Sequence, residues 1–206
     1  VKRRPARLPR SMRDALQAAS VATWTGPRTL AARPGALVFA AAPGHLPAGH
    51  RVYAIGDVHG ELAALRTLHR AVAEDLAARP VASAILIHLG DLIDHGPDSA
   101  GVVAWLAGEM PGYGLPSMTL RGDHEQMLLD ALDGDRAAAT DWLHAGGAAS
   151  LRSWGIAGTQ RQDWPALLPP AHVAFLHARP LSFQVGSYLF ACRDPPRSAA
   201  GAAISR

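Results

Sequence analysis

Cysteine is almost absent from this sequence, since Cys192 is the only one among its 206 residues. A single thiol excludes an internal disulfide framework and fits a protein of a reducing compartment. Long apolar runs are also lacking, and none approaches the roughly 20 residues that a membrane-spanning helix needs. The basic residues near the start lead into a segment that is too polar for the core of a signal peptide. We therefore predict a cytoplasmic protein without a membrane span.

Charged residues are few, at 18% of the chain, whereas apolar residues make up 49%. This balance is enough for a hydrophobic core and argues against wholesale disorder. The net charge of +3 is unevenly spread, because basic residues crowd the first 13 positions: Lys2, Arg3, Arg4, Arg7, Arg10 and Arg13. Residues 1–50 show no sustained period, and we interpret them as a basic extension rich in Pro, Ala and Arg. A solvated tail explains this extension better than a nucleic-acid arm does, so we expect no nucleic-acid partner.

Residues 51–190 have an alternating pattern of predicted elements. Short apolar runs typical of buried strands occur at 52–55, 82–89 and 117–120. Between them, 61–79 and 97–110 have the composition of helices, the second with Pro97 in its first turn. After the third strand we predict helices at 126–132, 138–145 and 172–180, and a hairpin over 181–191 that turns at Gly186 and Ser187. Strand, helix, strand, helix, strand predicts an α/β fold with a largely parallel sheet.

The first predicted helix carries apolar residues at helical spacing. They are Leu62, Leu65, Leu68, Val72 and Leu76. These positions share one side of a helix, so we expect that side to pack on the sheet. Pro80 would end the helix.

Each predicted strand is followed by a Gly-Asp pair. The three aspartates are Asp57, Asp91 and Asp123. Ligands bind at the carboxyl ends of strands in such sheets, so we expect these carboxylates to converge on one edge. Clustered carboxylates are costly to desolvate and need positive charge among them. Together with His59 they offer oxygen and imidazole ligands that suit Mn, Fe, Zn or Mg. Two such ions about 3.5–4 Å apart would activate water for in-line displacement at phosphorus.

Two further side chains complete the predicted chemistry. His124 adjoins the third carboxylate and could protonate a leaving oxygen, and Asp94 could hold that imidazole in place. A lone Gly-Asp pair is usually no more than a turn. Three pairs after three strands, two of them with a neighbouring histidine, favour a functional site.

These segments read GDVHG at 56–60, GDLIDHGPDS at 90–99 and LRGDHEQMLLDAL at 120–132. They resemble the GDxHG, GDxxDRG and GNHE motifs of the PPP-type serine/threonine protein phosphatases, particularly the bacterial and phage branch. The resemblance implies a calcineurin-like αββα metallophosphoesterase sandwich over residues 51–190. It also implies hydrolysis of phosphoserine, phosphothreonine or small phosphomonoesters by two-metal-activated water. A hydrolase similar to the diadenosine tetraphosphatases is a related alternative, because that branch shares GDxHG.

The resemblance also implies roles for individual residues. The metal ligands would be Asp57, His59, Asp91 and Asp123. Asp91 would bridge the two ions, His124 would be the general acid, and Asp94 would be its partner. We expect two divalent ions, manganese first, with iron, zinc and magnesium as alternatives.

This sequence departs from the family motifs at two site positions. Asp123 replaces the family's Asn and adds negative charge. His95 replaces the phosphate-clamping Arg, and an imidazole lacks the planar fork that matches phosphate. We therefore expect His95 to bind substrate more weakly than the family's Arg. Arg121 could assist in substrate binding, or it could be a structural ion-pair partner.

The C-terminal part departs further. The family pattern has a strand ending in His-Ala-Gly, whose His binds the second metal, and a later His ligand. Here the last strand runs into Cys192 and neither histidine follows. GC-rich codons from Ala191 onward, read one base later, encode His-Ala-Gly. We hypothesise a frameshift at that point, which makes 191–206 an aberrant tail and leaves the domain incomplete at its C-terminus.

The missing ligands leave a second class of function open. The chain could be a catalytically impaired remnant with a weak second metal site. The remaining histidines do not replace the lost ligands: we interpret His144 and His177 as ordinary surface or partly buried residues and His88 as a core histidine.

Overall fold

The computed structural model describes residue 42, residues 44–108 and residues 115–192. The described residues belong to two compact units. One contains 42, 44–48 and 184–189, and the other contains 49–108, 115–183 and 190–192. The predicted basic extension lies outside the described residues as far as residue 41, and the predicted aberrant tail does so from residue 193 onward.

The larger unit is built on a parallel three-stranded sheet, as the alternating pattern predicts. Its strands are β1 (His50–Ile55), β2 (Ser83–His88) and β3 (Ser117–Thr119), in the order β1-β2-β3. The register pairs Val52 with Ile85 and Ile87 with Met118. All residues of β2 after the first are buried, which is typical of a continuous apolar strand in a parallel sheet. All three strands therefore end at the same edge of the sheet.

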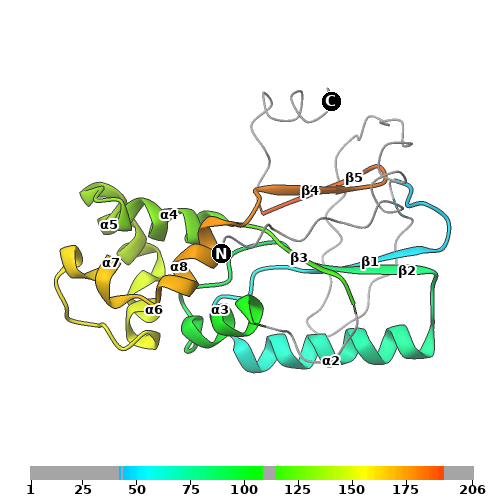
Figure 1. Ribbon diagram of the computed structural model, residues 1–206, viewed down its shortest axis with the longest axis horizontal. Coiled ribbons are helices and arrows are strands. Elements are labelled where there is room, and N and C mark those ends of the chain that lie inside the picture. The colour runs from blue at the N-terminus through cyan, green and yellow to red at the C-terminus, as the bar shows by residue number, and fades with distance from the viewer. Residues whose placement is uncertain (1–41, 43, 109–114, 193–206) are drawn as a thin grey trace, which may run out of the picture. The chain divides into compact units, whose positions relative to one another are not determined.

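Helix α2 (Leu62–Ala78) runs along one face of this sheet (Figure 1). It ends before Pro80, as predicted. Its buried side differs from the prediction at one position: Leu68 is 47% exposed, whereas His69 is only 1% exposed. After Leu65, a helix of 3.6 residues per turn brings the residue four positions on, rather than three, back to the sheet. An imidazole thus occupies a core position that the apolar pattern assigns to leucine.

Helix α3 (Ser99–Ala107) begins later than predicted. Its N-cap is Asp98, whose side chain accepts the backbone N–H of Gly101 at 2.8 Å. The prediction that Pro97 occupies the first turn is therefore wrong. An Asp at the N-cap satisfies a backbone donor that the helix itself cannot, and it sets the start of the helix.

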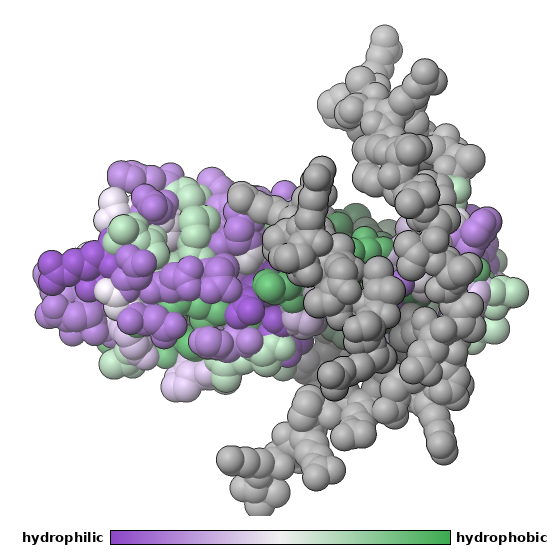
Figure 2. Space-filling model, turned by 90° about the horizontal axis from the view of Figure 1, so that it is seen from above, coloured by the Kyte–Doolittle hydropathy of each residue, from purple (hydrophilic) through white to green (hydrophobic). Residues whose placement is uncertain are grey.

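The remaining helices gather at the end of the sheet where the strands finish (Figure 1). They are α4 (Asp123–Leu132), α5 (Arg136–Trp142), the π-helical turn η1 (Leu143–Gly147), α6 (Ala148–Ser153), the 3₁₀ turn η2 (Arg161–Asp163), α7 (Trp164–Leu167) and α8 (Pro170–His177). Helix α4 begins at Asp123, earlier than the predicted 126, so Asp123 and His124 lie in its first turn. The face of these helices seen in Figure 2 is mostly hydrophilic, with apolar residues in small scattered patches.

A hairpin follows, with β4 (Ser182–Val185) and β5 (Tyr188–Ala191) joined by the predicted turn. Gly186 has a φ of 59°, a left-handed conformation that glycine adopts without strain. Ser187 donates its backbone N–H to the carbonyl of His45 at 3.0 Å, within the smaller unit. No helix among the described residues is long and apolar enough to cross a membrane.

The core of the larger unit lies between the sheet and the helices. Its most buried apolar side chains include Leu65, Ile87, Leu92, Ile93, Leu120, Leu128 and Trp142. Polar side chains are fully buried beside them, namely Asp94, Ser99, Glu125 and Ser150. Buried polar groups need hydrogen-bond partners. Asp94 belongs to the loop after β2, and the other three belong to α3, α4 and α6.

Candidate active site

The loops after β1 and β2 are joined to each other through their backbones. The N–H groups of Val58 and His59 both donate to the carbonyl of Asp91, each at 2.9 Å, and Gly60 N–H donates to the carbonyl of Leu92 at 2.8 Å. These bonds hold the first predicted motif against the second. The side chains of both loops are therefore presented at the same edge of the sheet.

Backbone strain is concentrated in these two loops. Among the described residues, the non-glycine residues with positive φ are His59 (44°), Asp91 (50°), Asp94 (75°) and His95 (57°). Such conformations cost of order 1–3 kcal/mol each and persist only where the surroundings impose them. All four positions are site residues predicted from the sequence.

A residue outside the predicted set holds the second loop in this shape. The carboxylate of Glu125 accepts backbone N–H groups from Asp91 at 2.9 Å, Leu92 at 2.7 Å and Gly122 at 2.7 Å. Burial raises the pKa of Glu125 to about 7, while these backbone donors act in the opposite direction. A Glu at the third position of a helix, bonded back to the N-cap N–H, is half of a capping box. That pattern, in the run from Gly122 to Glu125, is the sequence signal for its role.

Two of the predicted carboxylates lie together with the cysteine. Ligand atoms of Asp57, Asp91 and Cys192 all lie within 4.8 Å of one another. The Cys192 thiol is 3.2 Å from Asp91 Oδ2 and 3.8 Å from Asp123 Oδ1. The Cys192 thiol therefore connects Asp123 with the group of Asp57, Asp91 and Cys192. Burial and the neighbouring carboxylates raise the pKa of Cys192 to about 12, so the thiol is neutral in this arrangement.

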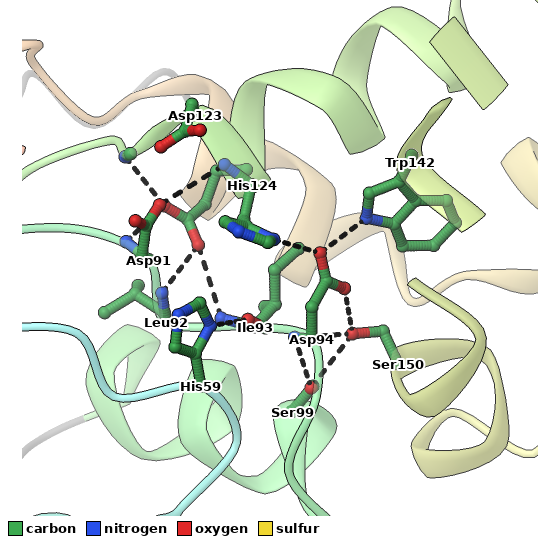
Figure 3. Close-up of polar contacts among 12 residues, drawn as sticks. His59, Asp91, Leu92, Ile93, Asp94, Ser99, Asp123, His124, Trp142 and Ser150 are labelled. Carbon is green, nitrogen blue, oxygen red and sulfur yellow. Dashed lines mark hydrogen bonds and ion pairs between the residues drawn. The ribbon is translucent and has the colours of Figure 1, made fainter. Parts of the chain in front are cut away.

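Asp94 lies at the centre of a buried hydrogen-bond network (Figure 3). Its Oδ2 accepts the indole N–H of Trp142 at 2.8 Å and lies 2.7 Å from His124 Nδ1. Its Oδ1 accepts the hydroxyl of Ser150 at 2.6 Å. Burial raises the pKa of Asp94, and the hydrogen bonds from Ser150, His124 and Trp142 oppose that rise. Because Nδ1 of His124 faces the carboxylate, Nε2 is the nitrogen that a substrate can reach.

The imidazoles of His59, His95 and His124 form a cluster. Ring centroids are 4.8 Å apart for His59 and His95, 4.8 Å for His59 and His124, and 5.3 Å for His95 and His124. The ring of His95 packs against Gly146, where an added Cβ would lie 2.7 Å from it. The glycine of the π-helical turn thus makes room for His95 beside the other two rings.

Arg121 is held through its backbone. Its backbone N–H donates to the carbonyl of Pro180 at 2.9 Å. Its buried Nε has no hydrogen-bond partner, and the guanidinium forms no ion pair within residues 42, 44–108 and 115–192. The alternative of a structural ion pair therefore finds no support in the described part of the chain.

Three further histidines, His88, His144 and His177, lie where the sequence predicts them. His88 is fully buried and has hydrogen-bonding neighbours on both ring nitrogens: His69 Nε2 at 2.9 Å and Thr119 Oγ1 at 3.1 Å. His144 and His177 are both exposed.

The donor set at this edge fits a divalent cation. Asp91 is 7% exposed, and its carboxylate accepts the thiol S–H of Cys192 at 3.2 Å and the backbone N–H of His124 at 3.3 Å. Among the described residues no Lys or Arg forms an ion pair with it. A carboxylate so largely removed from water needs a positive partner. Carboxylate oxygens are suitable ligands for such an ion. The imidazole of His59, predicted to join them, is grouped instead with those of His95 and His124.

An α/β fold whose parallel strands deliver carboxylates and imidazoles to one edge defines a metallophosphoesterase domain. Residues 50–180 match the family of calcineurin-like phosphoesterases, and the chain belongs to this family. The match confirms the resemblance and the fold class inferred from the three motifs.

Two bacterial relatives have similar sequences. The chain is 36% identical over 96 residues to serine/threonine-protein phosphatase 1 of Salmonella typhimurium, a match that covers 47% of this chain and 38% of the relative. It is 35% identical over 98 residues to serine/threonine-protein phosphatase 2 of Escherichia coli, again covering 47% of this chain and 38% of the relative. The chain thus spans well under half the length of these curated relatives.

Proposed function

We propose that this chain is a metal-dependent phosphoesterase that hydrolyses phosphoserine, phosphothreonine or small phosphomonoesters. The main support is the His124–Asp94 pair, 2.7 Å apart, in which the backbone N–H of His124 also donates to the carboxylate of Asp91. We take the imidazole as a proton donor and the carboxylate as a cation ligand, in a domain of the phosphoesterase family. The names of the bacterial relatives favour phosphoproteins as substrates. We also propose a domain that extends to residue 190 and a cytoplasmic location, which the single thiol favours.

The residues proposed to hold two divalent ions, preferably manganese, are Asp57, His59, Asp91 and Asp123. When bound, such ions neutralise the phosphate oxygens and lower the pKa of the attacking water. The chain's own contribution to this site is rigidity. Backbone bonds from Val58 and His59 to Asp91, and the Glu125 carboxylate behind it, hold the loops in their strained shape.

The proton transfer is assigned to His124. As the water oxygen bonds to phosphorus, the ester P–O bond breaks and the leaving oxygen gains negative charge. His124 gives its Nε2 proton to that oxygen, because its Nδ1 is held by Asp94. Asp94 is a positioning residue: its donors Trp142 and Ser150 fix the carboxylate, which fixes the ring.

His95 and Arg121 are proposed to contact the substrate phosphate. The ring of His95 lies 4.8 Å from that of His59 and is exposed, so a phosphate could reach it. Arg121 has an Nε without a hydrogen-bond partner in the described part of the chain. A guanidinium is planar and always charged, which suits a phosphate oxygen.

Replacing one ligand tests the proposal. In Mn²⁺, wild-type protein should hydrolyse para-nitrophenyl phosphate, and Asp57→Asn should reduce turnover to background because it removes a carboxylate from the cation site. Asp133→Asn, which changes an exposed carboxylate at the end of α4, is the matched control and should leave the rate unchanged. A rate in Asp57→Asn equal to that of wild type would refute the site.

A specific observation supports the alternative of an impaired remnant. Where the resemblance expects a histidine ligand after β5, the structure has the Cys192 thiol, 3.2 Å from Asp91. Sulfur is a soft ligand and suits a hard ion such as manganese poorly. Metal analysis separates the two functions: two ions per chain with turnover supports the enzyme, and one ion or none without turnover supports the remnant.

A further inference from the structure

We propose that His59, His95 and His124 form a second type of metal site, which binds a borderline transition-metal ion such as Zn²⁺ through three imidazoles and thereby inhibits the enzyme. The inhibitory part rests on the proposed function. Ligand atoms of the three side chains lie within 4.8 Å of one another. The three residues come from the loops after β1 and β2 and from the first turn of α4.

Two of the three rings are already oriented for binding. His59 Nδ1 lies 2.8 Å from the carbonyl oxygen of Ile93, which can only accept, so this nitrogen carries the proton. His124 Nδ1 is held in the same way by the carboxylate of Asp94 at 2.7 Å (Figure 3). The lone pair of each ring is then on Nε2. Imidazole ligands of metals usually have this kind of partner on the other nitrogen, which fixes the tautomer and the ring orientation.

The ring of His95 must move for all three nitrogens to bind one ion. Nitrogens about 2.0–2.1 Å from a tetrahedral Zn²⁺ lie roughly 3.3–3.5 Å from one another, closer than the 4.8 Å limit of this cluster. His95 is exposed, so its ring can turn toward an ion more easily than a buried ring can. Packing against Gly146 keeps it on the correct side of the cluster.

Ligand chemistry separates this site from the carboxylate site. Three neutral nitrogens suit Zn²⁺, Ni²⁺ or Cu²⁺, whereas Mg²⁺ and Mn²⁺ prefer oxygen. The family motif has an Arg at the position of His95, and a guanidinium cannot ligate a cation. The three-imidazole site therefore exists in this chain because His95 replaces the Arg of the motif.

Occupancy of the three-imidazole site excludes the proposed chemistry. His59 has one free nitrogen, because the other bonds to Ile93, so it can serve only one of the two sites at a time. Nε2 of His124 would hold the ion and could no longer carry the proton for the leaving oxygen. Zn²⁺ should therefore inhibit turnover supported by Mn²⁺.

The test measures Zn²⁺ affinity of the metal-stripped full chain by competition with a chromophoric chelator. His95→Gln should weaken the tightest Zn²⁺ site at least about tenfold, since even an outer-shell partner of a ligand is worth 10–100-fold. His177→Gln, which changes an exposed histidine of α8, is the matched control and should bind like wild type. Asp57→Asn should keep the affinity, because it alters only the carboxylate site.

The outcomes distinguish this inference from the proposed function. Equal Zn²⁺ affinity in wild type and His95→Gln overturns the three-imidazole site, whether or not the protein hydrolyses phosphoesters. A large loss in Asp57→Asn with none in His95→Gln also overturns it, because the ion would then sit at the carboxylates. A His95-dependent Zn²⁺ site without Mn²⁺-supported turnover would uphold the site and count against the proposed function. Where turnover exists, the Zn²⁺ concentration for half-inhibition should rise at least about tenfold in His95→Gln.

Discussion

Individual residues in this site are held by partners that come from elsewhere in the chain. The positive φ values of His59, Asp91, Asp94 and His95 are supported by bonds to other loops. The clearest example is Asp94, which is bonded to Ser150 and to Trp142. Trp142 and Ser150 lie 48 and 56 positions further along the chain. The contact of Asp94 with His124 could be predicted from the motif, but the residues that fix Asp94 could not.

At this scale we predict the effect of Asp94→Asn. An amide keeps the size of the side chain but removes the charged acceptor that holds His124 Nδ1. The rate should fall by about 10²–10⁴, the range expected for loss of general acid catalysis. The fall should be larger for phenyl phosphate than for para-nitrophenyl phosphate, because the more basic leaving oxygen needs the proton more. The measurement is kcat for both substrates, with the unfolding free energy as a check on folding.

An equal loss with both substrates would contradict the assigned role. In that case Asp94 would serve only the structure of the buried network.

A second polar network joins four elements, α2, α3, β2 and β3. The indole N–H of Trp105 donates to His69 Nδ1 at 3.2 Å, so the proton of His69 is on Nε2 and points to His88 Nε2 at 2.9 Å. His88 then carries its proton on Nδ1, facing Thr119 Oγ1 at 3.1 Å. The hydrogen bonds from Trp105 through His69 and His88 to Thr119 all point in one direction. This order requires both imidazoles to be neutral.

This network makes stability depend on pH. Burial lowers the pKa of His69, and burial together with the neighbouring His69 lowers the pKa of His88 to about 3. The unfolded chain binds a proton at each histidine near pH 6.5, while the folded chain does not. Stability contributed by the neutral pair is therefore complete above pH 6.5 and is lost as the pH falls below it. For His88 alone the loss at pH 5 is about 2 kcal/mol.

Urea unfolding of metal-free protein between pH 7.5 and pH 5 checks this prediction. His88→Gln should be less stable at neutral pH but should lose less stability on acidification than wild type. His177→Gln, altered at an exposed position, should follow the wild-type profile. The prediction is wrong if His88→Gln and wild type have parallel pH profiles.

For the molecule as a whole, we expect the carboxylate site to link metal binding to folding. Asp57 and Asp91 come from different strand ends, so an ion between them joins two loops. An ion that binds only the folded chain stabilises it by about 2.7 kcal/mol at 100 times its dissociation constant. For a domain of this size that raises the midpoint of thermal unfolding by roughly 5–10 °C.

Thermal unfolding with and without Mn²⁺ measures this linkage. Wild type should show the rise, a chelator should reverse it, and Asp57→Asn should show a much smaller one. Equal shifts in wild type and Asp57→Asn would mean that the stabilising ion binds elsewhere.

The sequence by itself determined the local elements and their endings. Apolar runs, helical spacing and Gly-Asp pairs are short-range patterns, so they predict β1, β2, β3 and the carboxylates that follow them. The same patterns fail where a hydrogen bond between buried side chains allows a polar residue to take an apolar position. His69 is buried in place of Leu68 because a hydrogen-bonded partner, His88, satisfies its ring.

Only the tertiary structure decided which distant side chains meet. Cys192 lies 101 positions along the chain from Asp91, yet their side chains are 3.2 Å apart. Ser150 reaches Asp94 across 56 positions, and Glu125 reaches the backbone of Asp91 across 34. No periodic pattern encodes such separations, because they depend on how the sheet and helices pack. That packing also places His95 against two other imidazoles, a neighbourhood that its position in the sequence does not reveal.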